Sequence, residues 1–150
     1  MCEFKQRLID CCLQGWNSDI NSKDRYTFFS SFKQTHGLLQ YLLTVKNVTL
    51  KRNQVRLRLG VSFLKPHRLC SAKTTQENFD CSFCEDTYES EIRFLLVCSK
   101  YSVLREKYIP AKFYTRPSAY KMALLLATRR HTRTLAIYVA KAFALRNEQN

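Results

Sequence analysis

Glycine and proline are scarce in this chain, which has only three of each among its 150 residues. Their scarcity excludes collagen-like and low-complexity architectures, and a hydrophobic content of 45% is typical of a folded globular protein. The longest apolar runs lie near residues 94–98 and 123–127 and are too short to cross a bilayer, so we expect no membrane partner. At this length we expect one domain, residues 1–150, that buries a real core.

Sequence patterns of catalysis are also absent. The chain has no Tyr-x-Asp-Asp turn, which would supply the paired carboxylates of a polymerase, no Gly-rich phosphate loop and no Gly-x-Ser-x-Gly elbow. None of the three histidines lies in a His-Glu-x-x-His spacing, and we interpret His36 and His131 as surface or capping residues. A Cys–His nucleophile pair would meet only in space, and nothing in the sequence favours one. We therefore expect no enzyme activity.

Acidic residues are missing from two long stretches of the chain. No Asp or Glu occurs in residues 25–76, which contain ten Lys or Arg, or in residues 107–147, which contain nine. Six of the twelve acidic residues lie between Glu77 and Glu91, and the whole chain has a net charge of +13. Such segregation favours a polyanionic partner, with nucleic acid first; the alternative is a solvated basic surface without a specific ligand.

The first acid-free stretch supplies the candidate nucleic-acid-binding residues. They are flanked by Tyr41 and Phe63, aromatic side chains of the kind that stack on unpaired bases. Contacts to RNA or DNA would be mostly to the phosphate backbone, and therefore sensitive to salt and weakly specific for sequence. For Arg56 and Arg58 the alternative is solvation on a helix surface or pairing with acidic residues. The candidates are Lys46, Lys51, Arg52, Arg56, Arg58, Lys65, Arg68 and Lys73.

The seven cysteines are odd in number and irregular in spacing, and the N-terminal residues lack the apolar core of a signal peptide. These features favour a reducing, intracellular setting, in the nucleus or cytoplasm, over a disulfide scaffold. Some of the thiols are then available for a metal ion.

Three of these thiols have the spacing of a zinc site. Cys81 and Cys84 form a Cys-x-x-Cys pair, in which two thiolates of one tight turn can bind a single Zn²⁺. Cys98 can add a third thiolate from the end of a short helix. The sequence therefore predicts a zinc ion at these three residues, and the alternative is that they are small hydrophobic side chains without a metal.

The fourth ligand is open. Arg93 occupies the place of the histidine in a Cys-Cys-His-Cys knuckle, and arginine has no lone pair with which to bind a metal. The site is then degenerate, completed by water, or completed by Cys70 or His67. Cys70 is the best chemical match, because four thiolates satisfy zinc fully. Arg93 can instead offset the negative charge of a thiolate-rich site.

Residues 81–109 contain Cys-x-x-Cys, an acidic spacer, Phe-Leu-Leu-x-Cys and Tyr-x-x-Leu-Arg, in that order. In this arrangement they resemble the zinc-binding tail of the reverse transcriptases of non-LTR (LINE-type) retrotransposons, with Arg93 in place of the motif histidine. The resemblance extends upstream to residues 4–10 and 47–62 and downstream to residues 135–143. It implies a domain that helps to hold template RNA or target DNA, while polymerase and endonuclease lie elsewhere in the parent protein.

Two other classes stay open. The helical surface can instead dock a protein partner, with the basic charge incidental to that role. The reading frame can also be a decaying retrotransposon fragment without a selected function, and Arg93 at the histidine position is what such decay would produce.

Periodicity and capping residues predict a mainly α-helical domain with a zinc-knuckle-like turn between helices. Its first helical part spans residues 1–64, a basic loop with the knuckle-like segment spans 65–100, and C-terminal helices span 101–147. Residues 47–60 fit a strand as well as a helix, and the resemblance favours the helix. Residues 65–80 are predicted to be a loop.

The first predicted helix has Phe4, Leu8, Cys12 and Trp16 on one face and ends at Asn17-Ser18. A second is expected to start at an Asn21-Ser22 cap and run through Phe32, followed by helices over residues 38–45, 47–60, 89–97, 99–108, 117–127 and 132–146. The last is predicted to bury Leu135, Tyr138 or Val139, Ala142 and Phe143, and to expose Arg133, Lys141 and Arg146.

Overall fold

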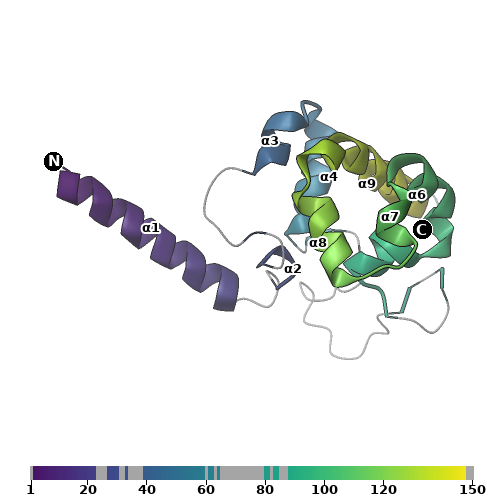
Figure 1. Ribbon diagram of the computed structural model, residues 1–150, viewed down its shortest axis with the longest axis horizontal. Helices are drawn as coiled ribbons and strands as arrows, with labels where there is room; N and C mark the ends of the chain where they lie inside the picture. Colours follow the sequence, from purple (N-terminus) through teal and green to yellow (C-terminus); the bar gives the residue numbers. More distant parts are fainter. Residues whose placement is uncertain are drawn as a thin grey trace.

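The computed structural model describes residues 2–22, 27–30, 33, 39–59, 61–62, 64, 80–81, 83–84 and 88–147. The described residues are mainly helical, which confirms the predicted fold class. The first helix, α1 (Cys2–Ser22), points away from the body that the later helices form (Figure 1). Among the described helices, none combines the length and the apolar character needed to cross a bilayer.

The end of α1 corrects the first predicted boundary. The helix continues beyond Asn17-Ser18 to Ser22, because Asn and Ser each weaken a helix by at most about 0.7 kcal/mol relative to Ala and no proline follows them. Leu8 and Cys12, on the predicted apolar face, are exposed.

The second predicted helix is described only in part. The Asn21-Ser22 cap is wrong, since both residues lie in the last turn of α1. The next helix, α2 (Thr27–Ser30), lies within the predicted range, and its Phe29 is buried. The remaining residues of that prediction, 23–26 and 31–32, lie outside the described part of the chain.

Residues 48–58 are helical, as the resemblance favoured. α3 (Gln40–Thr44) and α4 (Val48–Arg58) follow one another, with Asn47 as the cap of α4. The Asn47 Oδ1 atom accepts a hydrogen bond from the Leu50 N–H at 3.0 Å, which satisfies one of the free N–H groups in the first turn. α4 packs against α9 (Thr132–Asn147). Gly60 and the predicted loop up to residue 79 lie outside the described residues.

Short helical segments connect the cysteine motif to α9. The prediction for residues 89–97 is confirmed in part, because residues 91–97 are helical, with a π-helical turn from Arg93 to Val97, while residues 89 and 90 precede the helix. Pro110 ends one helix and is the N-cap residue of the next. This next helix has only four residues and was not predicted. The segments are η2 (Arg93–Val97), η3 (Ser99–Tyr101), α6 (Ser102–Tyr108), α7 (Ala111–Tyr114), α8 (Ala119–Ala127) and η4 (Arg129–His131).

The core is built around α9, whose buried face agrees with the prediction. An aromatic group joins this helix to the cysteine motif: Phe94 stacks on Phe143 at 5.2 Å between ring centroids and meets Tyr101 edge-on at 5.1 Å. The Tyr138 hydroxyl donates a hydrogen bond of 2.6 Å to the Phe94 carbonyl. The buried residues of the predicted face are Leu135, Tyr138, Val139, Ala142 and Phe143.

One predicted surface residue of α9 is buried instead. Arg133 and Lys141 are exposed as predicted, but Arg146 is 5% exposed and forms a two-pronged ion pair with the buried Glu89. The prediction was wrong because Glu89 precedes Arg146 by 57 residues and only the fold brings the two together. The pair fastens the last turn of α9 to the segment that leads into the cysteine motif.

Candidate metal centre and basic surface

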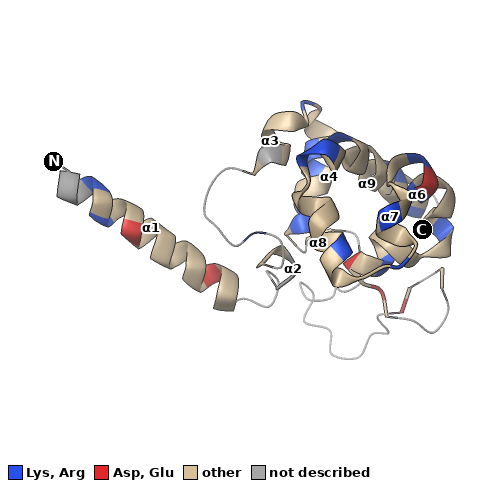
Figure 2. Ribbon diagram, in the orientation of Figure 1, with Lys and Arg blue, Asp and Glu red and all other residues tan. Residues whose placement is uncertain are grey.

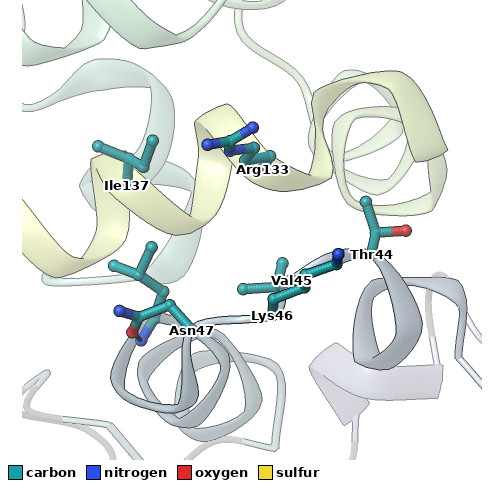
Figure 3. A pocket seen from close by; sticks show the side chains of 7 residues that line it. Thr44, Val45, Lys46, Asn47, Arg133 and Ile137 are labelled. Carbon is teal, nitrogen blue, oxygen red and sulfur yellow. Dashed lines mark hydrogen bonds between the residues drawn. The ribbon is translucent and has the colours of Figure 1, made fainter.

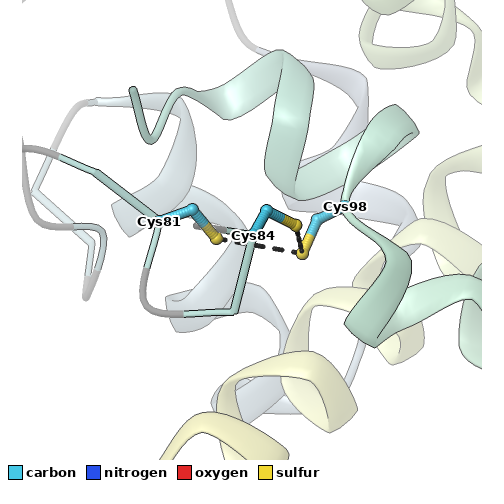
Figure 4. A group of neighbouring side chains, drawn as sticks. All are labelled: Cys81, Cys84 and Cys98. Carbon is cyan, nitrogen blue, oxygen red and sulfur yellow. Dashed lines mark hydrogen bonds between the residues drawn. The ribbon is translucent and has the colours of Figure 1, made fainter. Parts of the chain in front are cut away.

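Three cysteine side chains converge in the structure (Figure 4). The Cys84 Sγ atom lies 3.3 Å from the Cys98 Sγ atom, and the Cys81 Sγ atom lies 3.9 Å from it. All three sulfur atoms lie within 4.8 Å of one another. A tetrahedral Zn²⁺ with Zn–S bonds of about 2.3 Å holds its sulfur ligands about 3.8 Å apart. The three predicted ligands therefore lie at a spacing that a zinc ion fits with small adjustments.

The backbone explains why the thiols meet. The Cys84 N–H donates a hydrogen bond of 3.3 Å to the Cys81 carbonyl, which forms the tight turn. An isolated antiparallel bridge between Asp80 and Tyr88 closes the loop around this turn. On the other side, the Cys98 N–H donates to the Arg93 carbonyl at 2.8 Å, in the i to i+5 pattern of a π-helix. The extra residue in that turn sets the direction in which Cys98 points.

Arg105 supports the cysteine site through hydrogen bonds to its backbone. Its side chain is buried and donates hydrogen bonds to the Leu95 carbonyl, at 3.1 Å, and to the Cys98 carbonyl. It therefore holds both ends of the backbone segment that delivers the third thiol. Arg105 is the arginine of the Tyr-x-x-Leu-Arg motif, but no role was predicted for it, because a basic residue on an amphipathic helix is usually solvent-exposed.

The thiols of this site have unequal acidity. Burial raises the pKa of Cys84, but interactions with Cys98, Ser99 and Arg93 outweigh this effect and lower that pKa to about 7. Burial and the hydrogen bond with Cys84 raise the pKa of Cys98 to about 12. Without a metal, the pair thus keeps a proton on Cys98 and favours a thiolate at Cys84. Since zinc binds thiolates, its binding would release the Cys98 proton.

Arg93 stands beside the site rather than in it. Its side chain helps to lower the pKa of the Cys84 thiol and so favours the thiolate form, which is the charge-offsetting role considered for it above. Three thiolates around Zn²⁺ leave one net negative charge, and a neighbouring guanidinium reduces the free energy needed to place that charge in a partly buried position.

The other candidate ligands and thiols are placed as follows. Cys70 and His67 lie outside the described residues, so the fourth ligand stays a prediction. Cys11 and Cys12 are exposed on α1 and do not belong to the cluster. Within the part of the chain that the structure describes, Cys81, Cys84 and Cys98 form the group suited to hold a metal ion.

Four of the eight candidate nucleic-acid-binding residues reach the surface of the described body. Lys46 and Arg52 are exposed, and Lys51 and Arg56 are partly exposed, all on α4 or just before it. Figure 2 shows Lys and Arg, in blue, along α4 and the adjoining helices. Lys65, Arg68 and Lys73 lie outside the described residues, as does Phe63.

Arg58 does not belong to this surface, and the prediction that it contacts nucleic acid is corrected. Its side chain is 1% exposed, donates a hydrogen bond of 2.7 Å to the Leu126 carbonyl on α8, and lies 4.3 Å from the centroid of the Tyr41 ring. Tyr41 is itself buried, at 5% exposed, so its ring is not available to stack on a base. Burial lowers the pKa of Arg58 to about 10. This side chain connects α3, α4 and α8.

Arg133 on α9 joins the basic surface, although it was not among the predicted nucleic-acid-binding residues. Together with Lys46 it lines a pocket of about 450 Å³ between α9 and the segment that joins α3 to α4. Arg129 and Arg130 are exposed on η4, which contacts α3. The second acid-free stretch of the sequence was the signal for these residues, but only the packing of α9 on α4 places Arg133 beside Lys46.

In comparisons with known proteins, no family model, no curated protein and no solved structure matches this chain. The resemblance to the tail of LINE-type reverse transcriptases therefore stays a prediction. The geometry of the cysteine cluster and of the basic surface stands independently of it.

Proposed function

We propose that this chain is a non-catalytic nucleic-acid-binding domain that holds RNA or DNA by its phosphate backbone and is stapled by one zinc ion. The observation that carries the proposal is the basic surface of Lys46, Lys51, Arg52 and Arg56, extended by Arg133 on the neighbouring helix. Phosphates that contact such a surface release counterions, so the affinity depends on salt rather than on sequence. The resemblance to the zinc-binding tail of retrotransposon reverse transcriptases implies the same class of partner, a nucleic acid.

The proposed zinc ion has a structural role. It would tie the turn at Cys81 and Cys84 to Cys98 at the end of η2, and so stabilise the segment that leads into α6. Metal analysis of the purified chain, with native mass spectrometry before and after chelation, should find one zinc per chain. Cys84→Ser should abolish this binding, whereas the control Cys11→Ser, at an exposed thiol on α1, should retain it. Zinc that persists in Cys84→Ser would contradict the assignment.

The nucleic-acid role is tested by the salt dependence of binding. For a single strand, each neutralised phosphate contributes about 0.7 to the slope of log affinity against log salt. The double variant Lys46→Gln/Arg52→Gln should therefore reduce the slope by about 1.4 if both side chains contact phosphates. Fluorescence anisotropy with labelled RNA and DNA oligomers at several salt concentrations measures this slope.

A charge-matched control makes the test specific. Arg116→Gln/Lys141→Gln removes the same two charge types from exposed positions outside the proposed surface. The control should change the slope much less than Lys46→Gln/Arg52→Gln. Equal slopes for the two double variants would refute the proposed surface and leave only a general effect of net charge.

The second candidate function is a protein-interaction domain. It is favoured by two apolar side chains beside Lys46, Leu43 and Val48, which are 62% and 77% exposed. If the chain is a protein-interaction domain, the wild-type protein should bind heparin and nucleic acid equally weakly. The salt slope of Lys46→Gln/Arg52→Gln should then equal that of the control, Arg116→Gln/Lys141→Gln.

A further inference from the structure

A pocket between α9 and the segment that joins α3 to α4 has the size of a small-ligand site (Figure 3). Ile137 and Arg133 of α9 form one side of it, and Thr44 to Asn47 form the other. Its volume of about 450 Å³ falls in the range of about 300–1,000 Å³ that is typical of ligand pockets. The cavity is therefore large enough for a single nucleotide, and its two sides come from segments far apart in the sequence.

The charged residues of this pocket favour an anion. Lys46 and Arg133 line it from opposite sides, and no Asp or Glu is among the lining residues that the structure describes. Two like charges across a cavity repel each other, and a phosphate between them would turn this repulsion into two attractions. The arginine can form paired hydrogen bonds to phosphate oxygens, while the lysine acts as a point charge.

The uncharged residues favour a nucleotide over a phosphate ion alone. Val45, Leu50 and Ile137 give the pocket an apolar part that suits a sugar and a base. Asn47 also lines the pocket, and because its Oδ1 atom already accepts the capping hydrogen bond from Leu50, the amide N–H groups are the part of this side chain left to donate to a ligand. Donors beside two cations, next to an apolar wall, match a phosphate attached to an organic group.

We infer that this pocket binds one phosphorylated nucleotide of a nucleic-acid strand, with Arg133 and Lys46 on the phosphate and Ile137 and Leu50 against the sugar and base. The inference rests on the proposed function for the strand as a partner, but the pocket itself can be tested without one. It assigns to Arg133 a role beyond that of a surface charge, which distinguishes it from Lys141 on the same helix.

The first experiment uses a free mononucleotide. Titration of the ¹⁵N-labelled full chain with AMP should shift the amide signals of Asn47, Leu50 and Arg133, and should leave the signal of Lys141 in place. Inorganic phosphate at the same concentration should shift them less, because it lacks the group that meets the apolar wall. Equal shifts with phosphate and AMP, or no shift with either, would overturn the nucleotide pocket.

The second experiment uses single-residue variants and a short single-stranded RNA. Arg133→Gln should weaken RNA binding about tenfold, as expected for the loss of a charge-assisted contact, and Lys141→Gln should weaken it less than threefold. Arg133→Lys should recover part of the loss, because it restores the charge but not the paired hydrogen bonds. Circular dichroism checks that each variant is folded.

The outcomes separate the two proposals. If wild type binds RNA and the losses in Arg133→Gln and Lys141→Gln are equal, the pocket inference fails and the basic surface stands. If AMP shifts the pocket signals but wild type shows no salt-dependent binding to RNA or DNA, the strand assignment and the proposed function fail, and the pocket is a site for free nucleotides.

Discussion

Replacement of Arg58 tests whether this side chain stabilises the fold from a buried position or contacts nucleic acid. The Arg58→Ala variant loses a charged hydrogen bond to the Leu126 carbonyl, worth about 1.5–3 kcal/mol, and the contact with the Tyr41 ring, worth about 0.5–2 kcal/mol. We therefore expect the free energy of unfolding to fall by about 3 kcal/mol. For a chain of this size the melting temperature should then fall by roughly 6–12 °C.

Two companion variants sharpen this prediction. Arg58→Met keeps most of the packing volume but leaves the Leu126 carbonyl without its donor, so a smaller loss of about 1–3 kcal/mol is expected. Arg52→Ala, at an exposed position on the same helix, should change the stability by no more than about 0.5 kcal/mol.

Urea denaturation followed by circular dichroism measures the stability of all three variants. Anisotropy at a temperature where all are folded then measures RNA binding. Arg58→Met should keep the wild-type salt slope, whereas Arg52→Ala should reduce it. The reasoning is refuted if Arg58→Ala is as stable as Arg52→Ala and weakens RNA binding to the same extent, because its side chain would then lie in solvent.

Three further predictions follow from other contacts. Glu89→Gln should lower the free energy of unfolding by about 3 kcal/mol, since it removes the negative charge that offsets the buried Arg146 guanidinium, and a thermal melt with no shift would contradict this. Arg105→Met should weaken zinc binding by about tenfold in a chelator competition, because the backbone at the third cysteine loses its support; unchanged affinity would rule out this supporting role. In metal-free protein, alkylation of Cys84 should reach half its maximal rate near pH 7, because its pKa lies at about 7 and more thiolate forms as the pH rises. Cys98, whose pKa is raised to about 12, should stay unmodified at that pH, which peptide mass spectrometry can check.

Local signals in the sequence predicted much of the helical framework. The apolar spacing of α9 predicted its buried face, because periodicity acts over one or two turns. Residues 47–60 fitted a strand as well as a helix, and the Asn47 cap of α4 was not predicted. The boundaries were less predictable: α1 runs past Asn17-Ser18, and α7 follows Pro110 as a single short turn. Weak helix formers shift the end of a helix only slightly in free energy, so neighbouring contacts decide where it stops.

The sequence by itself determined the cysteine site and the basic character of this protein. The Cys-x-x-Cys spacing places two thiols on one turn, and the acid-free stretches make the chain positive whatever its fold. Only the tertiary structure decided which cations face solvent. Arg58, Arg105 and Arg146 are buried on carbonyl or carboxylate partners, while Lys46 and Arg133 meet at one pocket. The physical reason is that a buried guanidinium needs partners to offset its lost hydration, and those partners are supplied by packing between segments distant in the sequence.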